Sequence, residues 1–274
     1  MNGIDVSHWN GAIDWVKAKT KVDFAFIKCS ERLVVDDQFV RNWSEAKRVG
    51  MRRAAYLFYR FNIDPGIQTR VFLQAFNGDY GEIAPIVDLE DDGIVAALKP
   101  AQVADLQWCL LLIEKFIGKK PIIYTRKYWF DPFVGNVAWA SAYQLWIANY
   151  TYNPAATPLM PLAWKTWAFY QWNNKGVGID YGAQPGDIDL DVEFGEVVIP
   201  PPVPPSHPVA TFTISTTQIV AGQSALLVWE AHGASGIYLD GQGVTGPTNN
   251  KLVKPTVNTT YTLRITYDGE PDTT

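Results

Sequence analysis

Histidine and cysteine are scarce in this 274-residue sequence, which contains three His and two Cys. The histidines lie far apart, at His8, His207 and His232, and only the first precedes residue 200. Cys29 and Cys109 form no CxxC motif, so the sequence offers little material for a metal site. This scarcity also disfavours a Ser–His–Asp or Cys–His mechanism. We expect no metal and no cofactor, and two buried thiols, with a disulfide as the weaker alternative.

Long apolar runs and a strong net charge are also absent. No segment approaches the roughly 18 apolar residues of a transmembrane helix. The first residues, 1–5, begin a strand and show neither the charged nor the apolar region of a signal peptide. The net charge of -5 gives no indication of a nucleic-acid surface. We therefore expect neither membrane insertion nor nucleic-acid binding.

What the sequence does contain is a core-forming composition, with 47% hydrophobic and 19% charged residues. Runs of β-branched and aromatic residues alternate with helical patterns, which is typical of a parallel sheet with covered faces. Strands are predicted at 2–6, 22–29, 53–61, 83–89, 121–125, 144–148, 166–171 and 188–192. Helices are predicted at 13–19, 38–48, 65–76 and 100–118. Eight strands with little helix between the last ones indicate a β/α barrel whose active site lies at the C-terminal ends of the strands.

The stretch 85–92, Pro-Ile-Val-Asp-Leu-Glu-Asp-Asp, places two acidic residues at the end of a buried strand. Asp88 and Glu90 share one strand face, about 7 Å apart at roughly 3.3 Å per residue. Crowding of two carboxylates raises the proton affinity of one of them, as a general acid requires. The alternative interpretation is a strand that ends in an exposed acidic turn.

Two further aspartates, Asp5 and Asp189, lie at or near the ends of the first and last predicted barrel strands. These strands are neighbours in a closed barrel, so the acidic residues can converge on one mouth. Taken alone, Asp5 is better explained as a turn residue before Ser7, and Asp189 as a solvated strand end.

Proline marks a domain boundary, since six of the ten residues in 199–208 are Pro. We predict three parts: a barrel domain at 1–197, a stiff linker at 198–208 and a small all-β sandwich at 209–274. The last part contains short alternating runs separated by turn residues.

Seven segments together carry a family resemblance: 3–11 (GIDVSHWNG), 55–58 (AYLF), 88–90 (DLE), 123–125 (IYT), 145–150 (LWIANY), 170–172 (YQW) and 188–191 (IDLD). They resemble signatures of glycoside hydrolase family 25, which comprises lysozymes acting on bacterial peptidoglycan. The resemblance covers about residues 2–195 and implies an irregular barrel of five β/α units and three further strands. The segments 222–229 (GQSALLVW) and 259–263 (TTYTL) make residues 209–274 resemble bacterial immunoglobulin-like repeats, as a wall-binding module or a spacer.

The resemblance implies cleavage of the β-1,4 bond between N-acetylmuramic acid and N-acetylglucosamine. Glu90 would act as general acid and then base, with Asp88 helping to hold it protonated. The substrate's own 2-acetamido group is the expected nucleophile; direct carboxylate attack and an inverting water remain open. Asp5 and Asp189 would orient the pair or the substrate. The last segment departs from the family's Asp-x-Asn pattern, so Asp187 and Asp191 compete with Asp189.

Aromatic and amide side chains on strands that approach the mouth are candidates for binding sugar. The set is Tyr56, Tyr124, Trp146, Tyr150 and Gln171, while Trp172 is better explained as barrel core. A non-catalytic wall binder, or a glycosidase for another N-acetylated glycan such as chitin, is the alternative function. The expected partner is the peptidoglycan glycan strand, and we expect a monomer that acts outside the cell or in the cell wall.

Overall fold

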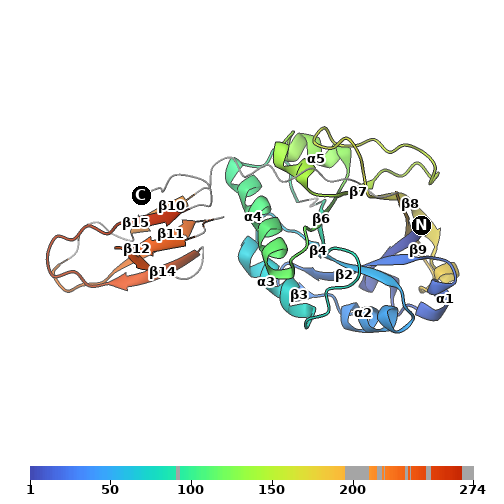
Figure 1. Cartoon of the computed structure of the whole chain (residues 1–274), viewed down its shortest axis with the longest axis horizontal. Helices are drawn as coiled ribbons and strands as arrows, with labels where there is room; N and C mark the ends of the chain where they lie inside the picture. The colour runs from blue at the N-terminus through green and yellow to red at the C-terminus, as the bar shows by residue number, and fades with distance from the viewer. Residues whose placement is uncertain are drawn as a thin grey trace. The chain divides into compact units, whose positions relative to one another are not determined.

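A computed structural model describes residues 1–90, 93–194 and, with short gaps, 210–266. The chain divides into two compact units, Met1–Pro204 and Pro205–Thr274 (Figure 1). The predicted Pro-rich linker, 198–208, lies outside the described residues, so its boundaries remain a prediction.

The first unit is a closed barrel of eight strands, as predicted. In sheet order they run β1, β9, β8, β7, β6, β5, β4 and β2, and pairing of β1 with β2 closes the barrel. A short strand β3 (Val34–Val35) extends the sheet beside β2. The barrel strands are β1 (Asn2–Val6), β2 (Phe24–Glu31), β4 (Arg52–Phe58), β5 (Ile86–Leu89), β6 (Ile122–Thr125), β7 (Leu145–Ala148), β8 (Phe169–Val177) and β9 (Asp187–Glu193).

Five helices follow the first five barrel strands and complete the five β/α units. They are α1 (Trp15–Lys19), α2 (Phe39–Arg48), α3 (Pro65–Ala75), α4 (Pro100–Ile117) and α5 (Lys127–Phe133). Helix α4 begins at Pro100, whose fixed φ suits a first helical position, and stops at Gly118, which takes the left-handed conformation (φ 76°). Figure 1 shows α3 and α4 side by side on the outside of the strands.

Helix α5 was not predicted from the sequence. It has seven residues and contains Pro132, so neither its length nor its composition is typical of a helix. Burial of Trp129 and Phe130 explains its presence, because tertiary packing stabilises a segment whose intrinsic propensity is poor.

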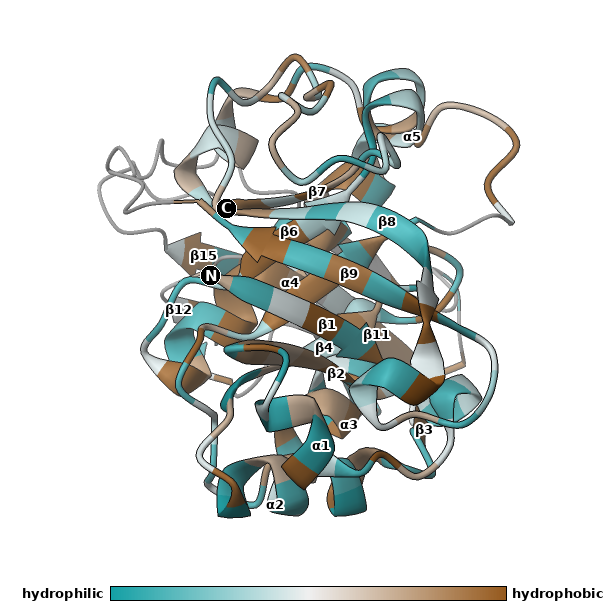
Figure 2. Ribbon diagram, turned by 90° about the vertical axis from the view of Figure 1, so that its right-hand side faces the viewer, coloured by the Kyte–Doolittle hydropathy of each residue, from teal (hydrophilic) through white to brown (hydrophobic). Residues whose placement is uncertain are grey.

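The last barrel strand corrects the expectation of a parallel sheet. Strand β9 runs antiparallel to both β8 and β1, which lie beside it in Figure 2. Strand β8 also extends beyond the predicted 166–171, to Val177. The connection from Val177 to Asp187 is shorter than the crossover of about a dozen residues that a parallel neighbour requires. An antiparallel return is therefore the only geometry open to it.

Alternate residues of each strand enter two different cores. On β5, Val87 and Leu89 pack toward the helices, whereas Ile86 faces the barrel interior with Phe26 and Trp146. Aromatic rings thus fill the interior near the N-terminal ends of the parallel strands. The next interior positions along the chain are polar, such as Asp88, which follows Ile86 by two residues. The barrel interior therefore has an apolar floor and a polar mouth.

The second unit contains two three-stranded antiparallel sheets. One is formed by β10 (Ala210–Ile214), β11 (Ala225–Ala231) and β14 (Thr248–Val253). The other is formed by β13 (Gln242–Gly243), β12 (Gly236–Leu239) and β15 (Leu263–Thr266). Buried side chains from both sheets form one cluster around Trp229. The predicted likeness to immunoglobulin domains remains a prediction.

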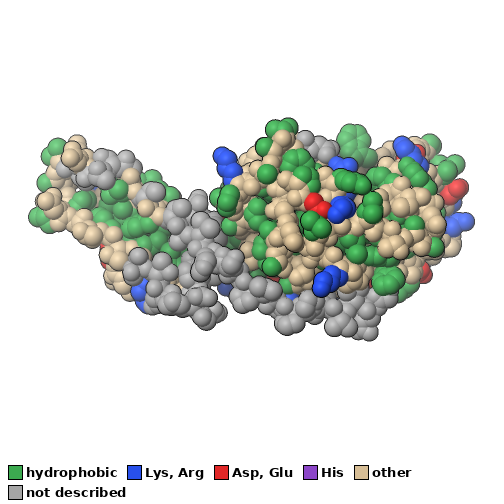
Figure 3. Space-filling view, turned by 90° about the horizontal axis from the view of Figure 1, so that it is seen from above, with side chains coloured by type: hydrophobic (Ala, Val, Ile, Leu, Met, Phe, Trp, Pro, Cys, Tyr) green, Lys and Arg blue, Asp and Glu red, His purple; other side chains and the backbone are tan. Residues whose placement is uncertain are grey.

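Both cysteines are buried and free, as expected. Burial raises the pKa of each thiol, and the Thr69 hydroxyl donates a hydrogen bond to Cys109 Sγ at 3.0 Å. Among the described helices, none is long and apolar enough to cross a membrane. On the face shown in Figure 3, Lys and Arg side chains of the described residues are scattered and form no continuous patch, and one of them lies beside an acidic side chain.

Candidate active site

A cavity of about 250 Å³ opens at the polar mouth of the barrel. All nine residues proposed from the sequence as catalytic or sugar-binding line it, so the structure brings the whole set together. These are Asp5, Tyr56, Asp88, Glu90, Tyr124, Trp146, Tyr150, Gln171 and Asp189. Their individual roles remain predictions.

Strand register explains the convergence of the carboxylates. Asp88 lies on β5 and Glu90 follows its end, two residues further on the same face. Asp5, near the end of β1, pairs directly with Asp189. Because β9 is antiparallel, Asp189 reaches the mouth from the beginning of its strand and not from its end.

Asp88 is the most deeply enclosed member of the central pair. It is 4% exposed, and its Oδ1 atom has no hydrogen-bond partner among the described residues. Burial raises its pKa well above the ordinary value, the charge of Glu90 raises it further, and the Lys28 ammonium opposes both effects. A buried carboxyl oxygen without a partner is costly unless a ligand satisfies it.

Glu90 is more open to solvent, with 26% of its side chain exposed. Its Oε2 lies 4.0 Å from a guanidinium nitrogen of Arg126, the residue that follows β6. The two carboxyls therefore share one face but differ in environment, one buried and one at the surface of the cavity. Two carboxyls in such different environments can take different roles in one reaction.

A hydrogen-bonded network holds the opposite wall. Gln171 Nε2 donates to Asp5 Oδ2 at 2.7 Å, and Gln171 Oε1 accepts from the Tyr124 and Tyr150 hydroxyls at 2.8 and 3.1 Å. Burial raises the pKa of both tyrosines, so they remain neutral. A tyrosine hydroxyl that donates one hydrogen bond can still accept others through its oxygen.

The three competing aspartates of β9 have different surroundings. Asp187 is exposed and pairs with Lys175 at 2.6 Å, and Asp191 is buried and accepts from Trp146 Nε1 at 2.8 Å. Only Asp189 lines the cavity. Burial and the charge of Asp187 raise its pKa to about 6. Burial, followed by the charges of Asp189 and Asp191, likewise raises the pKa of Asp5.

Trp146 belongs mainly to the core, although its surface forms part of the cavity floor. It is 1% exposed, and its ring centroid lies 4.3 Å from that of Tyr124 and 4.4 Å from that of Phe26. Trp172 packs against the core between barrel and helices, as its alternative interpretation predicted. Among the described residues, no group of three or more His, Cys, Asp or Glu has an arrangement that could hold a metal ion.

Comparison with known proteins identifies the family. The family model for glycosyl hydrolases family 25 matches residues 4–180. The chain belongs to glycosyl hydrolase family 25. It is therefore a glycoside hydrolase of the lysozyme type. The matched segment contains Asp5, Asp88 and Glu90, and ends before Asp189.

Individual relatives agree with this family membership. The uncharacterized protein YegX of Escherichia coli (strain K12) is 32% identical over 207 residues, which cover 72% of this chain and 71% of that protein. Lysozyme M1 of Streptomyces globisporus is 27% identical over 202 residues, covering 69% and 66%. A solved family 25 glycosyl hydrolase from Bacillus anthracis superposes with a TM-score of 0.62 at 27% identity, covering 72% of this chain and 89% of that one.

Four residues that line the cavity of this family 25 protein were not proposed as site residues from the sequence. Ser7, Trp9, Lys28 and Phe58 also line the cavity. Lys28 follows Phe24 and Phe26 at two-residue spacing on the interior face of β2, so strand alternation could have revealed it. Trp9 follows β1 directly, in the segment where a barrel enzyme has an active-site loop.

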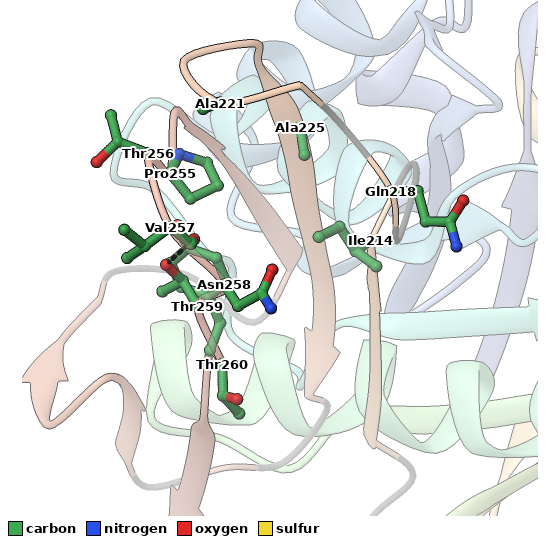
Figure 4. A pocket seen from close by; sticks show the side chains of 11 residues that line it. Ile214, Gln218, Ala221, Ala225, Pro255, Thr256, Val257, Asn258, Thr259 and Thr260 are labelled. Carbon is green, nitrogen blue, oxygen red and sulfur yellow. Dashed lines mark hydrogen bonds between the residues drawn. The ribbon is translucent and has the colours of Figure 1, made fainter.

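A larger cavity, about 490 Å³, lies in the second unit, outside the segment that matches family 25 (Figure 4). Its described lining consists of apolar, hydroxyl and amide side chains, including Ile214, Gln218, Asn258 and Thr260. No ionisable carboxyl, ammonium, guanidinium or imidazole group is among these described residues. The described lining therefore contains no acid pair of the kind that glycoside hydrolysis needs.

Proposed function

We propose that the chain is an N-acetylmuramidase that hydrolyses the β-1,4 bond between N-acetylmuramic acid and N-acetylglucosamine in peptidoglycan. The observation that carries this proposal is the pair Asp88 and Glu90 on one face, opening into one cavity with Asp5 and Asp189. Family membership supports peptidoglycan as the substrate class.

In this mechanism Glu90 protonates the leaving oxygen, because it is the more accessible carboxyl of the pair. Asp88 accepts the N–H of the substrate's 2-acetamido group at its unpartnered Oδ1 and stabilises the positive charge that develops on the sugar. The acetamido oxygen attacks the anomeric carbon and forms a cyclic intermediate. Glu90 then removes a proton from the water that opens this ring.

The network on the opposite wall positions the sugar. Gln171 fixes Asp5 on one side and orients the two tyrosine hydroxyls on the other. Those hydroxyl oxygens accept hydrogen bonds from sugar O–H or amide N–H groups, while the rings offer flat apolar contact. A ligand that carries N-acetyl groups suits this combination of acceptors.

Product analysis tests the proposal. Purified peptidoglycan is incubated with the protein, and the soluble fragments are reduced and analysed by mass spectrometry. A muramidase gives muramic acid at the new reducing end. Glucosamine at that position would contradict the assignment of the bond, and release of fragments from chitin but not from peptidoglycan would favour the other N-acetylated glycan.

The C-terminal unit is proposed to act as a wall-binding module or spacer, and the enzyme to work outside the cell or in the cell wall as a monomer. A non-catalytic wall binder is the second candidate function, but a binder has no use for two adjacent carboxyls of which one is buried. Binding of the wall without release of fragments would support it.

A further inference from the structure

Trp9 is unusual because its large ring is left in solvent at the rim of the active-site cavity. It is 76% exposed, and among the described aromatic side chains none is more exposed. Isolated exposed apolar residues are common, but this one also lines the cavity that contains Asp88 and Glu90. A flat indole at the edge of a sugar-binding cavity is a surface on which a pyranose ring can stack.

The backbone that carries Trp9 is firmly fixed. The short helix η1 (His8–Asn10) is capped by Ser7, whose Oγ accepts from Trp9 N at 3.3 Å. Gln184 Nε2 donates to the Trp9 carbonyl at 2.8 Å. Gly11 ends the turn with φ 68°, where a Cβ atom would lie 2.7 Å from Gln184 Oε1. The exposed ring is therefore held by a preorganised loop.

His8 supports the ring from one side. The two ring centroids are 4.5 Å apart. Asp36, with 2% of its side chain exposed, interacts with His8 Nδ1 at 2.6 Å and accepts from the His8 backbone N–H at 3.1 Å. Asp36 Oδ1 also accepts from Gln38 N at 3.0 Å. The Trp9 loop is thus tied to the turn that follows the β2–β3 hairpin.

A second cavity of about 250 Å³ includes His8 and Asp36 in its lining. It is lined by His8, the hairpin residues Glu31, Arg32, Val34 and Val35, and by Asp36 and Asp37. Lys28 lines both this cavity and the active-site cavity. The two cavities are therefore adjacent, with Lys28, His8 and Trp9 at their border.

We propose that Trp9 is the stacking platform of a distal glycan subsite, from which the strand continues past Lys28 into the hairpin cavity. The ligand is an N-acetylhexosamine unit of the same polysaccharide, outside the pair of sugars that flank the cleaved bond. This inference rests on the proposed function. Trp9 contributes binding and not chemistry, and His8 and Asp36 are positioning residues.

Kinetics on glycan strands of different length test this subsite. Trp9→Ala is expected to raise KM for long peptidoglycan strands about tenfold, equivalent to about 1.4 kcal/mol, and to change kcat less than twofold. Trp9→Phe keeps a stacking ring and should stay within threefold of wild type. Tyr128→Ala is the matched control, since Tyr128 is 74% exposed but lies outside both cavity linings. His8→Ala should raise KM by a smaller factor, again without a change in kcat.

The effect should grow with strand length and be smallest on the shortest fragments, which provide only the two sugars that flank the cleaved bond. A KM within twofold of wild type on long strands, or an equal loss on the shortest fragments together with a fall in kcat, would overturn the distal subsite.

Binding separates this inference from the proposed function. Glu90→Gln and the double variant Glu90→Gln/Trp9→Ala are sedimented with insoluble peptidoglycan over a range of protein concentrations. The double variant is expected to bind about tenfold more weakly, whichever bond the active enzyme cleaves. Equal binding of the two proteins would refute the role of Trp9 even if fragment analysis upholds the muramidase assignment.

Discussion

Replacing Asp189 by Asn should stabilise the protein at neutral pH while it lowers activity. The pKa of Asp189 is raised from 3.8 to about 6 by burial and by the charge of Asp187. A carboxyl whose folded pKa is raised binds its proton more tightly in the folded state. Ionised Asp189 therefore destabilises the folded state. This destabilisation is absent below pH 3.8, develops between pH 3.8 and 6, and is complete above pH 6.

The magnitude follows from the same two values. Each pKa unit corresponds to about 1.36 kcal/mol, so the difference between 3.8 and about 6 corresponds to about 3 kcal/mol. Solvent screening and proton sharing with the neighbouring aspartates reduce this to about 1–2 kcal/mol. For a unit of this size, that free energy raises Tm by roughly 3–6 °C.

Thermal unfolding between pH 4 and pH 8 measures the effect. The difference in Tm between Asp189→Asn and wild type should be near zero at pH 4 and reach its full value above pH 6. Asp180→Asn, a substitution at an exposed carboxylate, is the control and should show no such pH dependence. A constant difference across this range, or a lower Tm at neutral pH, would refute the reasoning.

Three further predictions concern two residues near Asp189 and one in the barrel outside the cavity. Gln171→Ala removes the hydrogen-bond partner of Asp5, Tyr124 and Tyr150. It should lower kcat/KM about 10- to 100-fold in a wall-clearing assay and also reduce Tm. Unchanged activity would show that the network is dispensable. Asp191→Asn keeps an oxygen for the Trp146 N–H but removes a buried carboxyl whose pKa is raised well above 3.8. Its Tm should therefore exceed that of wild type by an amount that grows as the pH rises above 3.8, with activity retained; a loss of activity would indicate a catalytic role for Asp191. Arg53 is buried beside Trp43 and paired with Asp79 and Glu82. Arg53→Ala should therefore lower the free energy of unfolding by about 3 kcal/mol, measured by urea unfolding. A decrease of less than about 1 kcal/mol would contradict this account.

The barrel could be predicted from the sequence because its pattern is local. Runs such as Ile86–Leu89 identify strands, and Pro100 and Gly118 delimit a helix. The spacing of Asp88 and Glu90 on one strand face, and the distribution of the other acidic residues over strand ends, led to the set that now lines one cavity.

Features that depend on three-dimensional packing could not be predicted. Helix α5 exists because Trp129 and Phe130 are buried, although Pro132 argues against a helix locally. The antiparallel direction of β9 depends on the length of a connection, which counts only once both strand ends are known. Trp9 lies in a loop, and no periodicity indicates which side of a loop faces a cavity.

The measurement that tests the central claim most directly is fragment release from purified peptidoglycan by wild type and Glu90→Gln, with circular dichroism to establish that both are folded. Glu114→Gln, on helix α4, is the matched control. The account predicts fragments ending in muramic acid from wild type and Glu114→Gln, and at least a hundredfold slower release by Glu90→Gln. Equal release by the folded Glu90→Gln protein would contradict the assignment of Glu90 as the acid.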